Sequence, residues 1–212
     1  MHSLNFLEED KMEKPQIYSM AESGAWNSEY MSHHQNAWHY YGDYATLTKR
    51  LTKSEKRHQK KGHACESLVF HLTYDLHQAS YRAATSTHLF ACLAMEGFLN
   101  FYGVRRLGEP YYKAEIERLP IAKKLEKIFL TVFGEPPSDL LAKSVLETFQ
   151  LRNNLVHPKT QEITSSNIET FIDPHPRDHY VKKSMRTLND FALELCANDP
   201  DLSLDFYFPK HN

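Results

Sequence analysis

Apolar residues recur every three or four positions along most of this chain, which is the spacing that gives an α-helix one buried face. The longest such stretch begins near Glu66 and runs to about Tyr102, where Gly103 is expected to end it. Residues 89–100, in its second half, are apolar on nearly all sides. We therefore predict that this segment is either the central helix of the domain or part of a dimer interface.

The same spacing predicts further helices in the second half of the chain, each bounded by glycine, proline or a capping residue. These expected helices are residues 120–133, 138–156 and 177–197. The segments between and after them are expected to be a mixed connection over 104–119, a long loop over 158–176 and an extended strip over 202–209. The pattern indicates an all-α fold, a helical bundle with an N-terminal helical extension.

The N-terminal quarter has a different pattern. Residues 1–25 are polar and irregular and are expected to form an arm. Residues 26–41 carry aromatic residues at near-helical spacing, which predicts a short helix that docks on the core, with a break at Gly42-Asp43. We divide the chain into an extension with aromatic and basic helices over 1–64 and a helical domain over 65–212.

Composition narrows the classes of function. A formal net charge of −2 gives no overall attraction to nucleic acid or to anionic membranes, so any RNA contact must come from a local patch. The three cysteines lie far apart in the sequence, with neither metal-binding spacing nor a disulfide framework. No apolar run is long enough to span a bilayer. We therefore expect a cytoplasmic protein without membrane association.

The histidines raise the question of a metal site, because there are 13 of them. The groups His33-His34 with His39, and His58 with His63, are not expected to have the i, i+4 pairing with a nearby acid that is usual for metal ligands on one helix face. His175 and His179 lie four apart with Asp178 between them, so they are either zinc ligands or surface residues. Neither a phosphate-binding glycine loop nor a nucleophile motif is present. We expect no metal and no cofactor.

Residues 44–61 form a basic segment, in which seven cations and one acid, Glu55, give a local charge of +6. Spacings of three and four place most of the cations on one helical face. That face is either simply solvated or a track for RNA phosphates. The candidate RNA-binding residues are Lys49, Arg50, Lys53, Lys56, Arg57, Lys60 and Lys61.

The strongest candidate for chemistry lies at the end of the helix over 138–156, in the sequence Arg-Asn-Asn-Leu-Val-His that starts at Arg152. Arginine can hold a phosphate through its planar fork of donors, and histidine can move protons near neutral pH. Pro158 disfavours helical geometry at His157, so the histidine should end the helix. Asn153 lies four residues before His157 and so shares its helical face. Arg152 lies five residues before His157, which separates the two by roughly 140° around the helix at 3.6 residues per turn. Two copies across a twofold axis would bring both groups to one groove.

Glu96 is the second unusual residue, because it lies within an apolar stretch where an unpaired carboxylate is unfavourable. Arg152 on the other long helix is the expected partner. A solvated edge of the helix is the alternative position for Glu96.

Two segments resemble the HEPN superfamily of helical proteins. Residues 91–100, with an alanine-rich run before Glu96, an aromatic residue and Asn100, look like the first core helix of many bacterial HEPN proteins. Residues 151–158 look like their motif helix, whose pattern is Arg-x4-6-His. The resemblance covers roughly residues 65–197. It implies an α-helical bundle that forms a homodimer through the motif face and, in active members, cuts RNA without a metal.

Carried over to this chain, the resemblance assigns catalytic roles to four residues. Arg152 would bind the scissile phosphate, His157 would transfer protons, Asn153 would orient groups in the groove and Glu96 would position Arg152. The RNA 2′-hydroxyl would attack its own phosphate, so neither metal nor cofactor is required. The implied setting is a toxin or phage-defence system with an antitoxin or regulatory protein as a further partner.

This chain departs from one HEPN toxin branch, in which a partner nucleotidyltransferase modifies a tyrosine two residues after the histidine. That position is Lys159 here. The alternative to an endoribonuclease is a non-catalytic HEPN-like module that binds a protein or nucleotide partner.

Overall fold

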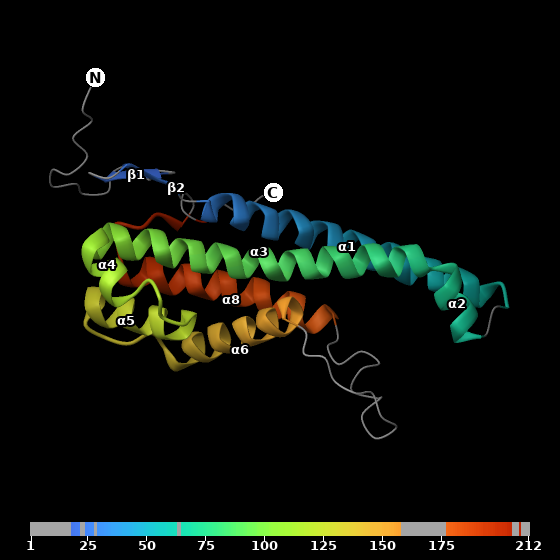
Figure 1. Ribbon diagram of the computed structural model, residues 1–212. Helices are drawn as coiled ribbons and strands as arrows, with labels where there is room; N and C mark the ends of the chain where they lie inside the picture. Colours follow the sequence, from blue (N-terminus) through green and yellow to red (C-terminus); the bar gives the residue numbers. More distant parts are fainter. Residues whose placement is uncertain are drawn as a thin grey trace.

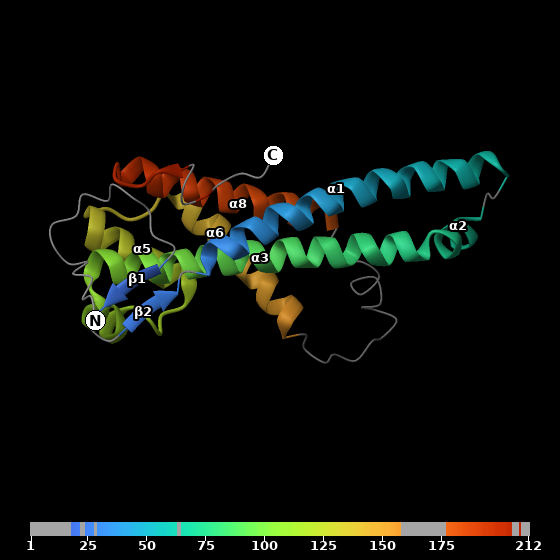
Figure 2. The same ribbon diagram turned by 90° about the horizontal axis from the view of Figure 1, so that it is seen from above.

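The computed structural model places a long antiparallel pair of helices at the centre of the molecule (Figure 1). It describes residues 18–21, 24–27, 29–62, 65–157, 177–204 and 208. Helix α1 (Tyr30–Lys60) runs beside α3 (Tyr74–Leu107), and the short helix α2 (Glu66–Leu72) joins their far ends. Seen from above, α1 and α3 separate toward α2 and form an arm that projects from the bundle (Figure 2).

Helices α4 (Glu109–Glu115), α5 (Ile121–Phe133), α6 (Asp139–Val156) and α8 (Arg177–Asn198) complete the bundle. Helix α3 contacts all four of them as well as α1. Its residues Ala91, Met95, Phe98 and Leu99 are fully or almost fully buried within one copy of the chain. Residues 89–100 therefore belong to the central helix, the first of the two alternatives. Helical packing throughout this bundle confirms the predicted all-α class.

Local sequence explains why the helices of the second half end where they do. Pro120 precedes α5, and Gly134, with φ 80°, ends it in the left-handed region that suits glycine. Ser138 caps α6, because its Oγ accepts a hydrogen bond from the backbone N–H of Leu141 at 3.2 Å. The same Oγ donates to Glu194 of α8 at 2.6 Å, so the start of α6 is tied to α8.

Several predicted boundaries are wrong. The chain does not break at Gly42, because α1 continues through it and joins the aromatic and basic segments into one helix. The long helix is interrupted at Thr73 and runs past Gly103 to Leu107. Gly103 allows the ring of Tyr112 to pack closely against α3, since a Cβ at this position would lie 2.7 Å from that ring. The connection over 104–119 contains α4.

The N-terminal region contains a small hairpin that was not predicted. Strands β1 (Tyr18–Ala21) and β2 (Gly24–Asn27) pair antiparallel, with Ser19 opposite Trp26. The helix expected to start at residue 26 starts at Tyr30 instead. Tyr30 and Ala37 of α1 are fully buried in the same core as α3. The rest of the expected arm and the expected loop over 158–176 lie outside the described residues.

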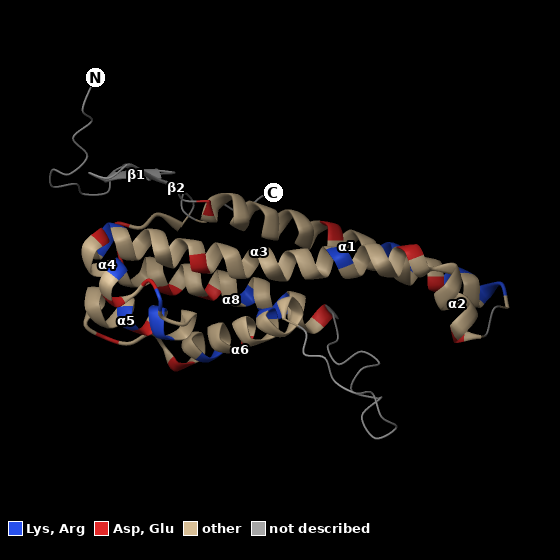
Figure 3. Cartoon of the chain, in the orientation of Figure 1, with Lys and Arg blue, Asp and Glu red and all other residues tan. Residues whose placement is uncertain are grey.

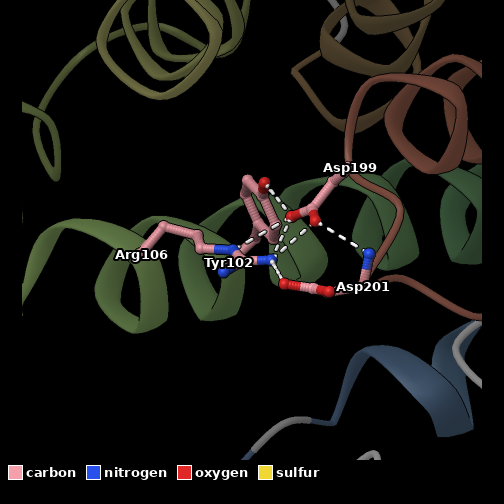
Figure 4. A network of polar contacts seen from close by, with 4 residues as sticks. All are labelled: Tyr102, Arg106, Asp199 and Asp201. Atoms are coloured by element: carbon pink, nitrogen blue, oxygen red, sulfur yellow. Dashed lines mark hydrogen bonds and ion pairs between the residues drawn. The ribbon is translucent and has the colours of Figure 1, made fainter. Parts of the chain in front are cut away.

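The last helix matches its prediction closely. It spans Arg177–Asn198, and its apolar residues at spacings of three to five are buried: Tyr180, Met185, Leu188, Phe191, Ala192 and Leu195. After it, Leu202 and Phe208 are buried as well, while residues 205–207 lie outside the described residues. The turn after α8 is anchored by Asp199, whose carboxylate accepts from Tyr102 and Arg106 of α3 (Figure 4).

Candidate functional site

The Arg-Asn-x3-His motif lies at the C-terminal end of α6, as predicted. His157 ends the helix with φ −124° and ψ 65°, outside the helical region, and its backbone N–H donates to the carbonyl of Asn153 at 2.8 Å. The side chains of Asn153 and His157 are exposed, and that of Arg152 is partly buried. The end of α6 therefore offers a histidine and an amide to solvent beside a partly buried arginine.

Arg152 lies against α3 and forms an ion pair with Glu96, which confirms the predicted pairing. Its Nη2 is 4.0 Å from Oε2 of Glu96, and its Nη1 donates to the side-chain oxygen of Asn153 at 3.0 Å. The Glu96 and Arg152 side chains are 38% and 30% exposed, so Glu96 is only half-buried. An ion pair this exposed contributes about 0–1 kcal/mol to stability. The pair therefore shows where the guanidinium lies, next to Glu96 of α3, and adds little to stability.

One copy of the chain does not direct the whole motif to one point. Arg152 faces α3, whereas Asn153 and His157, four residues apart, share the outer face of α6. Leu146 belongs to that outer face by its spacing and is 44% exposed, and Val156 is 45% exposed. The helix that carries the motif thus also carries apolar side chains that remain exposed among the described residues.

Sequence reasoning missed His88, which lies on the α3 face that Arg152 approaches. His88, Cys92 and Glu96 are spaced by four residues, so the pattern contained this signal. Nδ1 of His88 lies 2.5 Å from Ser184 Oγ on α8, and Ser184 donates its own proton to the carbonyl of Tyr180. Nδ1 must therefore carry the imidazole proton, and Nε2 is left as a buried acceptor without a partner among the described residues.

The surroundings of His88 and Cys92 disfavour the charged form of each side chain. Burial, together with the nearby positive charge of Arg152, lowers the pKa of His88 to about 4. Burial raises the pKa of the Cys92 thiol to about 12, although the charge of Arg152 acts in the opposite direction. Both groups are therefore neutral near pH 7, and neither is a nucleophile or a proton carrier for solvent.

Acid should destabilise this protein through His88. The unfolded chain binds a proton at this histidine below pH 6.5, whereas the folded protein binds it only near pH 4. The free energy of unfolding should therefore fall as the pH drops from 6.5 toward 4, by about 3 kcal/mol in total. Urea unfolding measured at half-unit pH intervals tests this.

His88→Gln should flatten that dependence between pH 6.5 and 4, since glutamine does not titrate. Gln at the exposed His71 provides the control and should leave the slope unchanged. An equal slope in the wild type and in His88→Gln would contradict the assignment.

The basic face is exposed as a whole. All seven candidate RNA-binding cations are exposed. Six of them lie in the second half of α1 and Lys61 follows directly after it, in the projecting arm (Figure 3). Glu55, the acid of this segment, pairs with His77 of α3 at 3.3 Å and so lies toward α3. The exposed charges of this segment are therefore those of its lysines and arginines.

A cavity of about 490 Å³ adjoins Glu96 on the side of α1, α4 and α5. Lys124 lines it and is only 4% exposed. Its Nζ donates to Oδ1 of Asn100 at 2.6 Å and to the hydroxyl of Tyr112 at 3.1 Å. Sequence reasoning missed this network, whose members come from three different helices.

Over the described ranges, no group of three histidine, cysteine or acidic side chains is arranged to hold a metal ion. His175, one of the two proposed zinc ligands, lies outside these ranges. The described helices include none with the length and apolarity needed to cross a bilayer. The chain matches no protein-family profile, no curated protein and no solved structure.

Proposed function

We propose that this protein is a metal-independent endoribonuclease of HEPN type that cuts single-stranded RNA. The observation that carries the proposal is the Glu96–Arg152 pair, which places an arginine next to the exposed Asn153 on the helix that ends at the exposed His157. A guanidinium that is partly exposed can exchange bound water for a phosphate and bind the phosphate through two parallel hydrogen bonds. A toxin or defence setting, with an antitoxin or regulatory protein as partner, belongs to the same proposal.

The chemistry needs only groups that this chain supplies. Arg152 holds the scissile phosphate and offsets the charge that develops on its oxygens. The 2′-hydroxyl of the RNA attacks the adjacent phosphorus and gives up its proton. The bond to the 5′-oxygen of the next nucleotide breaks and that oxygen takes up a proton, and His157 carries out this proton transfer. The products are a 2′,3′-cyclic phosphate and a 5′-hydroxyl. Glu96 acts as a positioning residue through Arg152, and Asn153 orients groups in the groove.

The proposed active unit is a homodimer joined at the motif face. Two observations support it. The motif residues diverge within one copy, and the exposed Leu146 and Val156 lie beside them. A twofold axis at this face would cover these apolar side chains and set Arg152 of one copy against His157 of the other.

Purified protein should cut single-stranded RNA in the presence of a chelator and leave cyclic phosphate ends. A 2′-deoxy substitution at the cut nucleotide should block cleavage, because the attacking hydroxyl is then missing. Intact RNA after incubation with the wild type would refute the enzyme and leave a non-catalytic binding module.

Reversing three charges of the basic face tests its proposed role as an RNA track. Lys53→Glu, Arg57→Glu and Lys60→Glu together should weaken RNA binding and reduce the slope of log affinity against log salt by about 2. This slope is about 0.7 for each phosphate contact with a single strand. Fluorescence anisotropy over a range of salt concentrations measures it.

The control changes three exposed lysines of α4, α5 and α6 to glutamate, namely Lys113, Lys123 and Lys143. It changes the net charge by the same amount, so it should lower the affinity slightly and leave the slope unchanged. Equal effects of the two triple variants would mean that the α1 face is only solvated.

A further inference from the structure

The cavity beside Glu96 combines hydrogen-bond donors at its base with acceptors near its mouth. Lys124 and Tyr112 are 4% and 3% exposed and form the base. Glu117, which follows α4, is exposed and lines the same cavity. Such a mixture of both hydrogen-bonding types suits a flat polar ligand better than a simple ion.

The hydrogen bonds at the base determine which groups remain for a ligand. Oδ1 of Asn100 accepts from the hydroxyl of Tyr112 at 2.6 Å and from Nζ of Lys124 at 2.6 Å, which uses both of its lone pairs. Tyr112 uses its proton on Asn100 and accepts from Lys124 at 3.1 Å. Among the described residues, the amide N–H groups of Asn100 and the third N–H of Lys124 are therefore left to donate to an acceptor edge of the ligand.

One wall of the cavity is apolar, and the cavity volume of about 490 Å³ lies in the range of small-molecule sites. Leu93, Phe101 and Val104 lie along one face of α3 and provide surface for an aromatic ring. Glu96 belongs both to this lining and to the ion pair with Arg152. A ligand in the cavity would therefore lie near Arg152, the residue that binds the scissile phosphate in the proposed function.

We propose that this cavity binds a guanine base of the RNA and so selects the nucleotide beside Arg152. Guanine has two adjacent acceptors, O6 and N7, for the donors of Asn100 and Lys124. It also has two adjacent donors, N1–H and N2–H₂, for the carboxylate of Glu117. Adenine presents an amino group where guanine has O6, so it would face the donors unpaired. The inference rests on the proposed ribonuclease function for the identity of the substrate.

Binding of guanosine to the full-length protein tests the site without cleavage. Calorimetry should detect guanosine and show at least tenfold weaker binding of adenosine. Glu117→Gln should weaken guanosine binding at least fivefold, because one amide oxygen replaces two carboxylate oxygens. Glu115→Gln is the control, since Glu115 is exposed on the adjoining α4 and is not among the lining residues. Equal binding of the two nucleosides, or binding of spermidine instead of either, would overturn the proposal.

Mapping of cut sites separates this inference from the proposed function. Cleavage concentrated next to guanosines, and lost from them in Glu117→Gln, supports both. Guanosine binding by a protein that leaves RNA intact supports the base site and refutes the ribonuclease. Cleavage spread evenly over all four nucleotides refutes the base site and leaves the ribonuclease in place.

Discussion

Replacing His157 by alanine should lower the rate of RNA cleavage by about 10²–10⁴-fold, because the reaction then loses its proton-transfer group. Arg152→Ala should lower it by about 10²–10³-fold, since the scissile phosphate loses its cation. Both changes should leave the fold intact. His157 is exposed, and the Glu96–Arg152 pair contributes only about 0–1 kcal/mol. Single-turnover cleavage and thermal unfolding measured on the same preparations test this.

Two controls use the same residue types away from the motif. His71 on α2 and Arg82 on α3 are exposed, and alanine at either position should leave cleavage at the wild-type rate. If His157→Ala and Arg152→Ala also cut at the wild-type rate, any nuclease activity of the preparation comes from another site or from a contaminant.

Mixing the two inactive variants tests the proposed sharing of groups between copies. In a dimer of Arg152→Ala with His157→Ala, one groove keeps the arginine of the second variant and the histidine of the first. The mixture should therefore recover part of the wild-type activity after subunit exchange. A mixture as inactive as its components would mean that each site uses groups of a single copy, or that the chain is monomeric.

The helix boundaries show what local sequence can and cannot predict. Gly134 and Ser138 act through their own backbone and side chain, so the end of α5 and the start of α6 were predicted correctly. The predicted break at Gly42 was wrong. A glycine inside a helix is unfavourable by only about 1 kcal/mol relative to alanine, and the packing of α1 along α3 outweighs this cost. Gly103 misled the prediction because the glycine serves packing against Tyr112, which no local pattern reveals.

Part of the candidate site could likewise be predicted from the sequence and part could not. A carboxylate within an apolar stretch requires a partner, so Glu96 and Arg152 could be paired from the sequence alone. Lys124 also lies within an apolar helix face, between Ile121 and Leu125, and this signal was overlooked. Its partners Asn100 and Tyr112 are brought to it by the packing of α3 and α4, which the sequence does not specify directly.

The polar network at Asp199 fixes the turn after α8 to the C-terminal end of α3 (Figure 4). Asp199 is 5% exposed, and its Oδ2 accepts from the hydroxyl of Tyr102 at 2.6 Å and from Nε of Arg106 at 2.9 Å. Its Oδ1 accepts from Nη2 of Arg106 at 2.6 Å, which makes the ion pair bidentate. Burial and the bond to Asp199 raise the pKa of Tyr102 far above its usual range, so this phenol remains a donor.

Asp199→Ala should lower the free energy of unfolding by about 3–4 kcal/mol, because it leaves the buried Tyr102 hydroxyl without its acceptor and leaves the Arg106 guanidinium with only the exposed Asp201. For a chain of this size, that corresponds to a fall of roughly 10 °C in the melting temperature. Asp201→Ala is the matched control. Asp201 also contacts Arg106, at 3.4 Å, but its side chain is 52% exposed, so its loss should change stability by less than about 0.5 kcal/mol. Similar losses in the two variants would mean that the net charge near Arg106 matters and that the buried network does not. A large loss confined to Asp199→Ala would identify the network as the clamp between α3 and α8.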